Sequence, residues 1–260
     1  MRKAVISLLC ALALLPCKSG QAQDKQMRIA SLEWLPYVGS SLPAQGLSTF
    51  IVAQAAARFG HSVKIDYFPW KRAMQLGGRD PLYAGYFPAY YTAERAAECH
   101  FSQPIGSSNV GFAYLRETPF DWDSLEDLIV PAKLGIGVVY GYSNGEKFDV
   151  LMKQGRIKVE SSSSDGQNIR KLALGRVRAA VVDEAVLRYL LKTDPMLASQ
   201  ARNIVFHPKL LAELKIYICF QQTAPGLEMK QAFDRALQDL NVRKLEEEYF
   251  QKLDQHKAQP

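Results

Sequence analysis

Aromatic side chains beside proline or glycine are the residues in this sequence best suited to binding a small molecule. Rings held in loops or at strand ends form rigid apolar walls, and such walls line most ligand pockets. The Tyr hydroxyl and the Trp NH can also orient a bound solute by hydrogen bonding. Any one ring has local packing as its alternative explanation, but the set as a whole predicts a pocket. Its members are Trp34, Tyr37, Trp70, Tyr86, Phe87 and Tyr142.

A carboxylate follows one of the most apolar strand patterns in the chain. Asp183 comes directly after the run "RAAVV", at the expected carboxyl end of a strand. Open α/β sheets place their ligand-binding residues at this end. The alternative is a helix N-cap, because the helical pattern "EAVLRYLLK" begins at Glu184. Both interpretations stay open at this point.

A short polar turn precedes another predicted helix. The segment "GYSNGEKF" at 141–148 places Ser143 and Asn144 just before the helix start. Backbone NH groups at such a position carry partial positive charge and accept an anion. A plain capping turn is the equally weighted alternative.

Signatures of metalloproteases, nucleotide-binding loops and metal sites are absent from the sequence. It contains no HExxH or Walker motif, and no GxGxxG after a strand. The four histidines, His61, His100, His207 and His256, lie far apart and lack metal-ligand spacing. We therefore expect a protein that is not an enzyme, with no catalytic residues, no metal and no cofactor.

Strand and helix patterns alternate along the chain and must position these residues. Turn residues separate the elements, and the serine run at 161–164 indicates a surface turn. Such alternation is typical of an α/β protein with largely parallel sheets. Strands are predicted at 27–34, 62–68, 110–117, 133–141, 156–161, 178–183 and 215–222. Helices are predicted at 47–59, 70–78, 122–129, 145–155, 165–175, 184–192, 225–241 and 242–254.

The amino terminus has the features of a secretory signal. Arg2 and Lys3 precede the apolar run "AVISLLCALALLP", and small residues lead to a predicted cut near Ala22. Removing residues 1–22 deletes Arg2, Lys3 and Lys18, which lowers the formal charge from +6 to +3. A charge this small and scattered argues against nucleic acid as a partner. We expect a soluble, exported, periplasmic protein.

Two cysteines remain after the predicted cut. An oxidising compartment allows Cys99 and Cys219 to form a disulfide. Cys219 lies in the apolar run "KIYICF", however, and small buried thiols are common in such runs. The pattern favours two separate buried thiols and leaves the disulfide as the alternative.

The order of the motifs resembles a known family over nearly the whole mature chain. "EWLPY", "YAGYFP", "YTAER", "FSQPI", "GVVYGYSNGEKF", "IRKLALGRVRAAVVDE" and "KIYICF" follow one another as in the extracellular solute-binding proteins of family 3. These are periplasmic receptors best known from the uptake of polar amino acids. The resemblance implies two α/β lobes, joined by two crossing strands, that close on a solute. It divides the chain into a signal peptide (1–22), lobe one (23–113), lobe two (114–219) and a return to lobe one (220–260).

The resemblance also implies roles for single residues. Tyr86, Phe87 and Pro88 are expected in the wall of the cleft, whereas Thr92 and Arg95 are expected in a structural turn. Asp183 matches the lobe-two acid that pairs with an ammonium group, and Ser143 and Asn144 match a turn that donates backbone NH groups. The arginine that clamps the carboxylate of an amino acid is expected in the crossing strand. That position falls at Gly111, near Ser108, so we expect a cationic or aromatic solute rather than a standard α-amino acid.

The function implied is capture of a small solute by hinge closure. The solute is polar or aromatic, and an amino-bearing one fits the pairing with Asp183. We expect a monomer that delivers its solute to an ABC-type membrane permease. One alternative is a sensory or partner-binding module without a role in transport. Another is a dehydratase-like enzyme, in which Glu33 or Asp183 serves as the general acid.

Overall fold

The computed structural model describes residues 25–118, 120–129 and 133–257. The predicted signal peptide lies outside these residues. Within them, ten strands form one continuous sheet, ordered β2-β1-β3-β10-β5-β8-β6-β7, with β4 on β10 and β9 on β5. The strands are β1 (Lys25–Ser31), β2 (His61–Tyr67), β3 (Gly85–Tyr90), β4 (Cys99–Phe101), β5 (Gly106–Leu115), β6 (Ile136–Val139), β7 (Val159–Ser162), β8 (Ala179–Asp183), β9 (Ile204–Phe206) and β10 (Ala212–Gln221).

Each end of the sheet is a parallel group of strands. At one end β1 pairs in parallel with β2 and β3, and at the other end β6 pairs in parallel with β7 and β8. Every residue of β6 and β8 is buried, as expected for parallel strands covered on both faces. The apolar runs "IGVV" and "AAVVD" therefore form the strands that their composition predicts.

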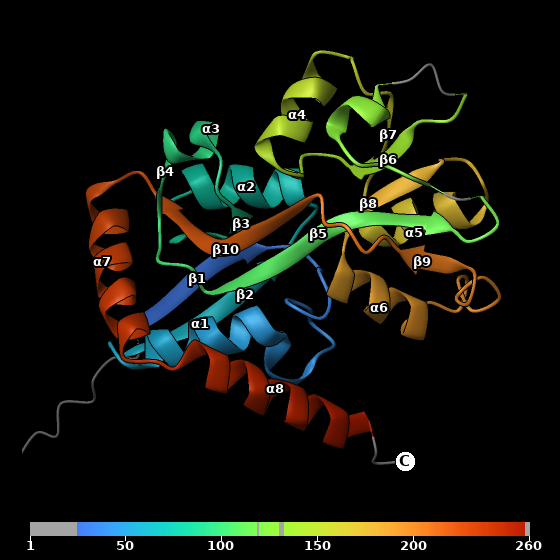
Figure 1. The fold of residues 1–260 in the computed structure, drawn as a ribbon. Helices are drawn as coiled ribbons and strands as arrows, with labels where there is room; N and C mark the ends of the chain where they lie inside the picture. The colour runs from blue at the N-terminus through green and yellow to red at the C-terminus, as the bar shows by residue number, and fades with distance from the viewer. Residues whose placement is uncertain (1–24, 119, 130–132, 258–260) are drawn as a thin grey trace, which may run out of the picture.

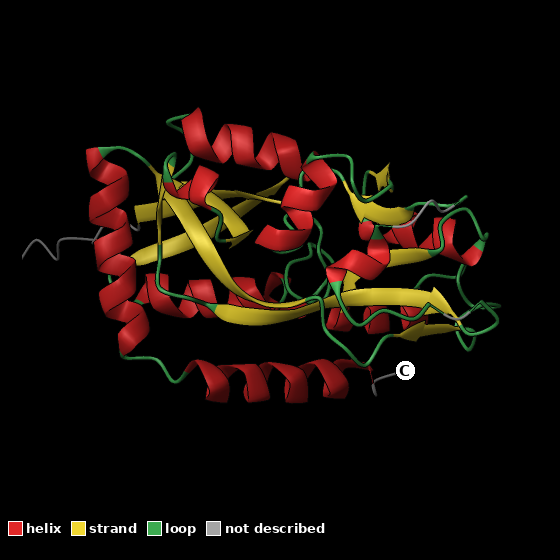
Figure 2. Ribbon diagram, turned by 45° about the horizontal axis from the view of Figure 1, so that its top comes forward, coloured by secondary structure: helices red, strands yellow, loops and turns green. Residues whose placement is uncertain are grey.

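Two antiparallel strands connect these groups. β5 and β10 pair with each other from Val110↔Ala212 to Gly106↔Ile216. β10 continues onto β3, and β5 continues onto β8. The two strands lie side by side in the middle of the molecule and pass between its two halves (Figure 1; Figure 2). We call the half built on β1–β3 lobe one and the half built on β6–β8 lobe two.

Helices cover both lobes. The α-helices are α1 (Leu47–Ala57), α2 (Trp70–Arg79), α3 (Ala93–Ala96), α4 (Glu146–Lys153), α5 (Asp165–Ala173), α6 (Glu184–Thr193), α7 (Ala224–Gln238) and α8 (Val242–Lys257). Two 3₁₀ helices, η1 (Pro43–Gln45) and η2 (Leu125–Leu128), complete the described set. α7 packs on β10 and α1, and α8 packs on α1, so the chain returns to lobe one after its last crossing (Figure 1). The predicted residue limits of the lobes stay a prediction.

The structure corrects the expectation for the two cysteines. Cys99 of β4 and Cys219 of β10 form a disulfide, with their Cα atoms 5.5 Å apart. The prediction of two separate thiols is wrong, because pairing of β4 with β10 places the two side chains against each other. The residues joined lie 120 positions apart, and all of lobe two lies between them in the sequence. The bond therefore ties the entry into lobe two to the exit from it.

Candidate functional site

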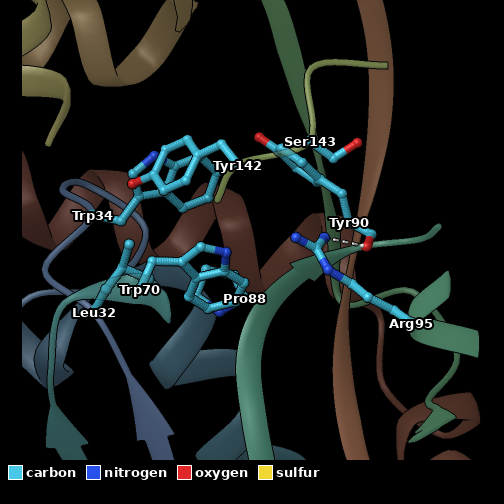
Figure 3. Close-up of a pocket in the computed structure, with 8 residues that line it drawn as sticks. All are labelled: Leu32, Trp34, Trp70, Pro88, Tyr90, Arg95, Tyr142 and Ser143. Carbon is cyan, nitrogen blue, oxygen red and sulfur yellow. Dashed lines mark hydrogen bonds between the residues drawn. The ribbon is translucent and has the colours of Figure 1, made fainter. Parts of the chain in front are cut away.

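The structure has a cleft between the two lobes, lined in part by the aromatic residues from which a pocket was predicted. One part of it holds about 290 Å³ of space, partly open to solvent, and an adjoining part holds about 240 Å³. The first part is lined by Leu32, Trp34, Trp70, Pro88, Tyr90, Arg95, Tyr142 and Ser143 (Figure 3). The second is lined by Trp34, Tyr90, Val110, Tyr142, Ser143, Asn144, Asp165, Val181, Val182 and Asp183. Trp34, Tyr90, Tyr142 and Ser143 belong to both.

The predicted aromatic residues divide between the cleft and the core. Trp34, Trp70 and Tyr142 line the cleft, and Tyr37 stacks on Trp34 with ring centroids 4.4 Å apart. Tyr86 instead packs edge-on against Trp70, and neither it nor Phe87 is among the lining residues described.

Phe87 departs from the expectation of a cleft wall because its side chain is fully buried in the core. Successive residues of a strand point to opposite faces, so its neighbour Pro88 reaches the cleft instead.

Asp183 is both the helix cap and the cleft residue that the sequence left as alternatives. Its Oδ1 accepts the backbone NH of Val186 at 2.9 Å, which caps α6. Its Oδ2 accepts the hydroxyls of Ser108 at 2.5 Å and Tyr37 at 3.2 Å. Because the Ser108 proton is given to Asp183, the 2.6 Å bond between Tyr90 and Ser108 must be donated by the tyrosine. The carboxylate of lobe two is thus held by hydroxyls of lobe one and of crossing strand β5.

A second carboxylate faces the same space. Asp165 begins α5 and is 8% exposed, and its Oδ2 accepts the Tyr142 hydroxyl at 3.1 Å. Burial raises the pKa of Asp165 to about 7; the nearby charge of Asp183 acts in the same direction, and the Tyr142 hydrogen bond opposes it. Burial also raises the pKa of Asp183, against the hydrogen bonds that the charged form accepts. Each carboxylate therefore carries a desolvation cost that its protein neighbours offset only in part.

Arg95 brings a positive charge to the wall of the cleft formed by lobe one. Thr92 caps α3 by accepting the NH of Arg95, and the arginine side chain turns back toward the cleft (Figure 3). Its guanidinium donates to the carbonyl oxygens of Tyr90 at 2.8 Å and Gly141 at 3.2 Å, and it lies 5.7 Å from the ring centre of Trp70. Desolvation lowers its pKa, but an arginine stays charged at any ordinary pH.

Arg95 places an arginine in the cleft, although the crossing-strand position expected to hold one is Gly111. The family resemblance placed the expected arginine at Gly111. The ring of Phe206 there lies 2.6 Å from where a Cβ would stand, so a side chain at this position would require the ring to move. The guanidinium reaches the cleft from α3 instead. Arg95 and Asp165 are the charged cleft residues that sequence reasoning missed.

The turn at 143–144 does not present the anion site that its sequence suggested. Asp149 of α4 reaches back to this turn and accepts the Ser143 hydroxyl at 2.7 Å and the Asn144 NH at 3.0 Å. The chain's own carboxylate thus occupies the Ser143 hydroxyl and the Asn144 NH, one of the backbone donors expected to bind a ligand. Ser143 and Asn144 still line the cleft, so their contribution is to its shape.

Contacts across the cleft show that the two lobes are closed against each other. Arg95 of lobe one reaches the carbonyl oxygen of Gly141 in lobe two. On the rim, Lys71 donates to the Tyr140 hydroxyl at 2.8 Å, and Lys153 pairs with Glu94 at 2.7 Å. Exposed pairs of this kind contribute only about 0–1 kcal/mol each, so buried groups must decide the stability of the closed form.

Comparison with known proteins supports the architecture. No protein-family model matches the sequence, and no curated protein matches it. Solved structures do match, among them a histidine kinase sensor domain with similarity to periplasmic binding proteins (TM-score 0.71, 16% identity, 88% of this chain and 96% of that one). The chain has the two-lobed fold of the periplasmic binding proteins. A variant of the arginine-binding protein of T. maritima is similar over 88% of this chain and 95% of its own (TM-score 0.70, 17% identity).

A third similar structure is an ancestral amino acid-binding protein described as a precursor of the enzyme cyclohexadienyl dehydratase. It matches 88% of this chain and 95% of its own at a TM-score of 0.68 and 16% identity. At such identities the comparisons show the fold, and the ligand must be argued from the cleft itself. In the described part of the chain, none of the helices combines the length and apolar character needed to span a membrane.

Proposed function

We propose that this chain is a periplasmic solute-binding protein that captures a small amino-bearing solute between its lobes. Uncompensated charge in the closed cleft carries the proposal. Arg95 lines one wall, and Asp165 and Asp183 line the other. None of the ion pairs between described residues includes any of these three side chains. Charges that are half-buried or buried without an oppositely charged partner are costly, so a ligand with matching charges gains from entering.

The arrangement fits a zwitterion. An anionic group near Arg95 accepts charge-assisted hydrogen bonds from the guanidinium, and an ammonium group on the opposite wall meets the carboxylates. The rings of Trp34, Trp70 and Tyr142 cover apolar or aromatic parts of the solute. A ligand touching both walls binds the closed form more tightly than the open form, and only such differential affinity drives closure.

Delivery to an ABC-type permease is the role we favour for the closed form. The similarity to a kinase sensor domain supports a second candidate, in which closure signals to a sensor instead. The dehydratase precursor keeps the enzyme alternative relevant. We infer retention without turnover, so a bound solute recovered from the protein is chemically unchanged.

A thermal-shift screen of the mature chain tests the proposal. Amino acids, amines and the corresponding acids are the ligands to compare. A ligand at a hundred times its dissociation constant stabilises the folded state by about 2.7 kcal/mol, which raises the midpoint by about 5–10 °C for a chain of this size. We expect such a shift from at least one zwitterionic amino compound.

Replacement of Arg95 by methionine is the matching variant. It keeps most of the length of the side chain and removes the guanidinium, so we expect affinity for the zwitterion to fall at least about tenfold. Arg72→Met is the control, because Arg72 is exposed on α2 over the ring of Phe68 and outside the cleft. An equal loss of affinity in both variants, or no loss of affinity in Arg95→Met, contradicts a ligand site beside Arg95.

A further inference from the structure

The two carboxylates of the cleft differ in how many protein donors they already accept. A carboxylate offers about four acceptor sites. Asp183 receives the hydroxyls of Tyr37 and Ser108 and the NH of Val186. Three of its about four acceptor sites are therefore committed to the protein. About one site is left for a ligand ammonium.

Asp165 keeps acceptor capacity for a ligand. It receives the Tyr142 hydroxyl, which leaves about three of the four sites open. Its side chain lines the same part of the cleft as Asp183. Its position at the first residue of α5 follows from the Ser164 cap, whose hydroxyl accepts the NH of Gln167. The carboxylate is therefore held in place by the helix and by Tyr142, while part of it stays unused.

The surroundings of Asp165 suit a cation. Trp34, Tyr90 and Tyr142 line the cleft beside it, and aromatic faces attract ammonium and guanidinium groups. The charged group that acts on it most strongly is Asp183, which repels its negative charge. An arriving ammonium thus meets two carboxylates, of which Asp165 has more free acceptor sites than Asp183.

We propose that Asp165 anchors the amino group of the solute, and that Asp183 is a positioning residue that holds the lobes together through Tyr37 and Ser108. This inference rests on the proposed function and adds to it the residue that binds the amino group. The family resemblance implied that Asp183 has this role, whereas the inference assigns it to Asp165.

Two matched pairs of probes separate the amine from the rest of a ligand. L-tyrosine is compared with 3-(4-hydroxyphenyl)propanoate, and L-glutamine with 4-carbamoylbutanoate; each acid lacks only the α-amino group of its partner. Dissociation constants are measured by calorimetry at pH 8 for the mature chain, Asp165→Asn and Asp183→Asn. The amide introduced by Asp165→Asn is nearly isosteric with the carboxylate and still accepts the Tyr142 hydroxyl, so the fold is expected to persist.

The ratio of affinities within a pair is the deciding quantity. For the unmodified chain we expect the amino compound of at least one pair to bind about tenfold or more tightly than its acid. Asp165→Asn should bring that ratio close to one. Asp183→Asn should weaken both members of the pair alike and preserve the ratio, because it loosens the closed form.

The outcomes distinguish this inference from the proposed function. A preference for the amine that survives in Asp165→Asn, or disappears only in Asp183→Asn, overturns the inference and leaves solute capture intact. Equal binding of amine and acid by the unmodified chain also overturns it. Failure of all four probes to bind at millimolar concentration counts against both the inference and the proposed function.

Discussion

Replacing both Cys99 and Cys219 by alanine is expected to lower the free energy of unfolding by about 2–5 kcal/mol. The bond closes a long loop, because the two residues lie 120 positions apart in the sequence. The longer the loop that a disulfide closes, the more it lowers the entropy of the unfolded chain, so we expect a large stabilisation. For a chain of this size the change corresponds to a fall of about 5–15 °C in the unfolding midpoint. Denaturation of the oxidised chain and of the double variant, followed by circular dichroism, measures it.

Reducing agent provides the control for this prediction. It should lower the midpoint of the unmodified chain, once the bond has been reduced in denaturant, toward that of the double variant, and leave the variant unchanged. Both cysteines are buried, so a reduction step in denaturant is needed for access. Equal stability of the oxidised chain and the variant would show that the bond contributes nothing.

Asp165→Asn is expected to stabilise the ligand-free chain at pH 8 by about 2–4 kcal/mol. The pKa of Asp165 rises from 3.8 to about 7 on folding, so the folded chain binds the carboxyl proton more tightly than the unfolded chain. The stability that this tighter proton binding contributes is fully present below pH 3.8 and is lost as the pH rises through 7. The shift corresponds to about 4 kcal/mol, and the favourable placement of a negative charge at the start of α5 reduces the cost by up to about 1 kcal/mol.

The pH dependence identifies the cause of that stabilisation. The ionisable groups that act on Asp165 are Tyr142 and Asp183, with Tyr90 across the cleft. Denaturant unfolding should show a difference of about 1–2 kcal/mol between variant and parent at pH 5, where only the unfolded chain is largely ionised, and the full difference at pH 8. A difference that does not grow between these pH values contradicts titration of a buried carboxylate.

Asp127→Asn serves as a control of opposite sign. Hydrogen bonds from the backbone NH groups of Asp123 and Ser124 lower the pKa of Asp127. Its contribution to stability is therefore present above the unfolded pKa and lost as the pH falls. Removing the charge at this surface cap should destabilise the chain at pH 8, where Asp165→Asn stabilises it.

Most strands and helices could be predicted from the sequence because their signals are local, whereas the two-lobed architecture was implied by the family resemblance. Apolar runs such as those of β6 and β8 can be stable only when buried on both faces, and each predicted helix lies between turn residues. The short strands β4 and β9 carry too few residues for a pattern of their own. Their positions depend on pairing with β10 and β5.

The candidate site was predictable only where local chemistry marked it. Trp34, Trp70 and Tyr142 stood out as rings beside turns, and Asp183 as a carboxylate at a strand end. Arg95 was assigned to a structural turn because its sequence position gives no sign that the side chain folds back toward the cleft.

Asp165 follows a run of serines that indicates a surface turn, yet the closed lobes bury it. The disulfide depends on the pairing of segments 120 positions apart. In both cases long-range contacts, rather than local sequence, set the result.

Tryptophan fluorescence of Trp122→Phe tests most directly whether solute is captured between the lobes. The chain has three tryptophans; Trp34 and Trp70 line the cleft, and Trp122 packs on Phe112 in the core of lobe two. Titration of this variant with the best ligand of the thermal-shift screen should give a saturable change in emission, with a midpoint equal to the calorimetric dissociation constant. In the Arg95→Met background the midpoint of the same titration should rise at least about tenfold. Calorimetric binding with unchanged emission would place the ligand elsewhere on the protein and contradict capture in the cleft.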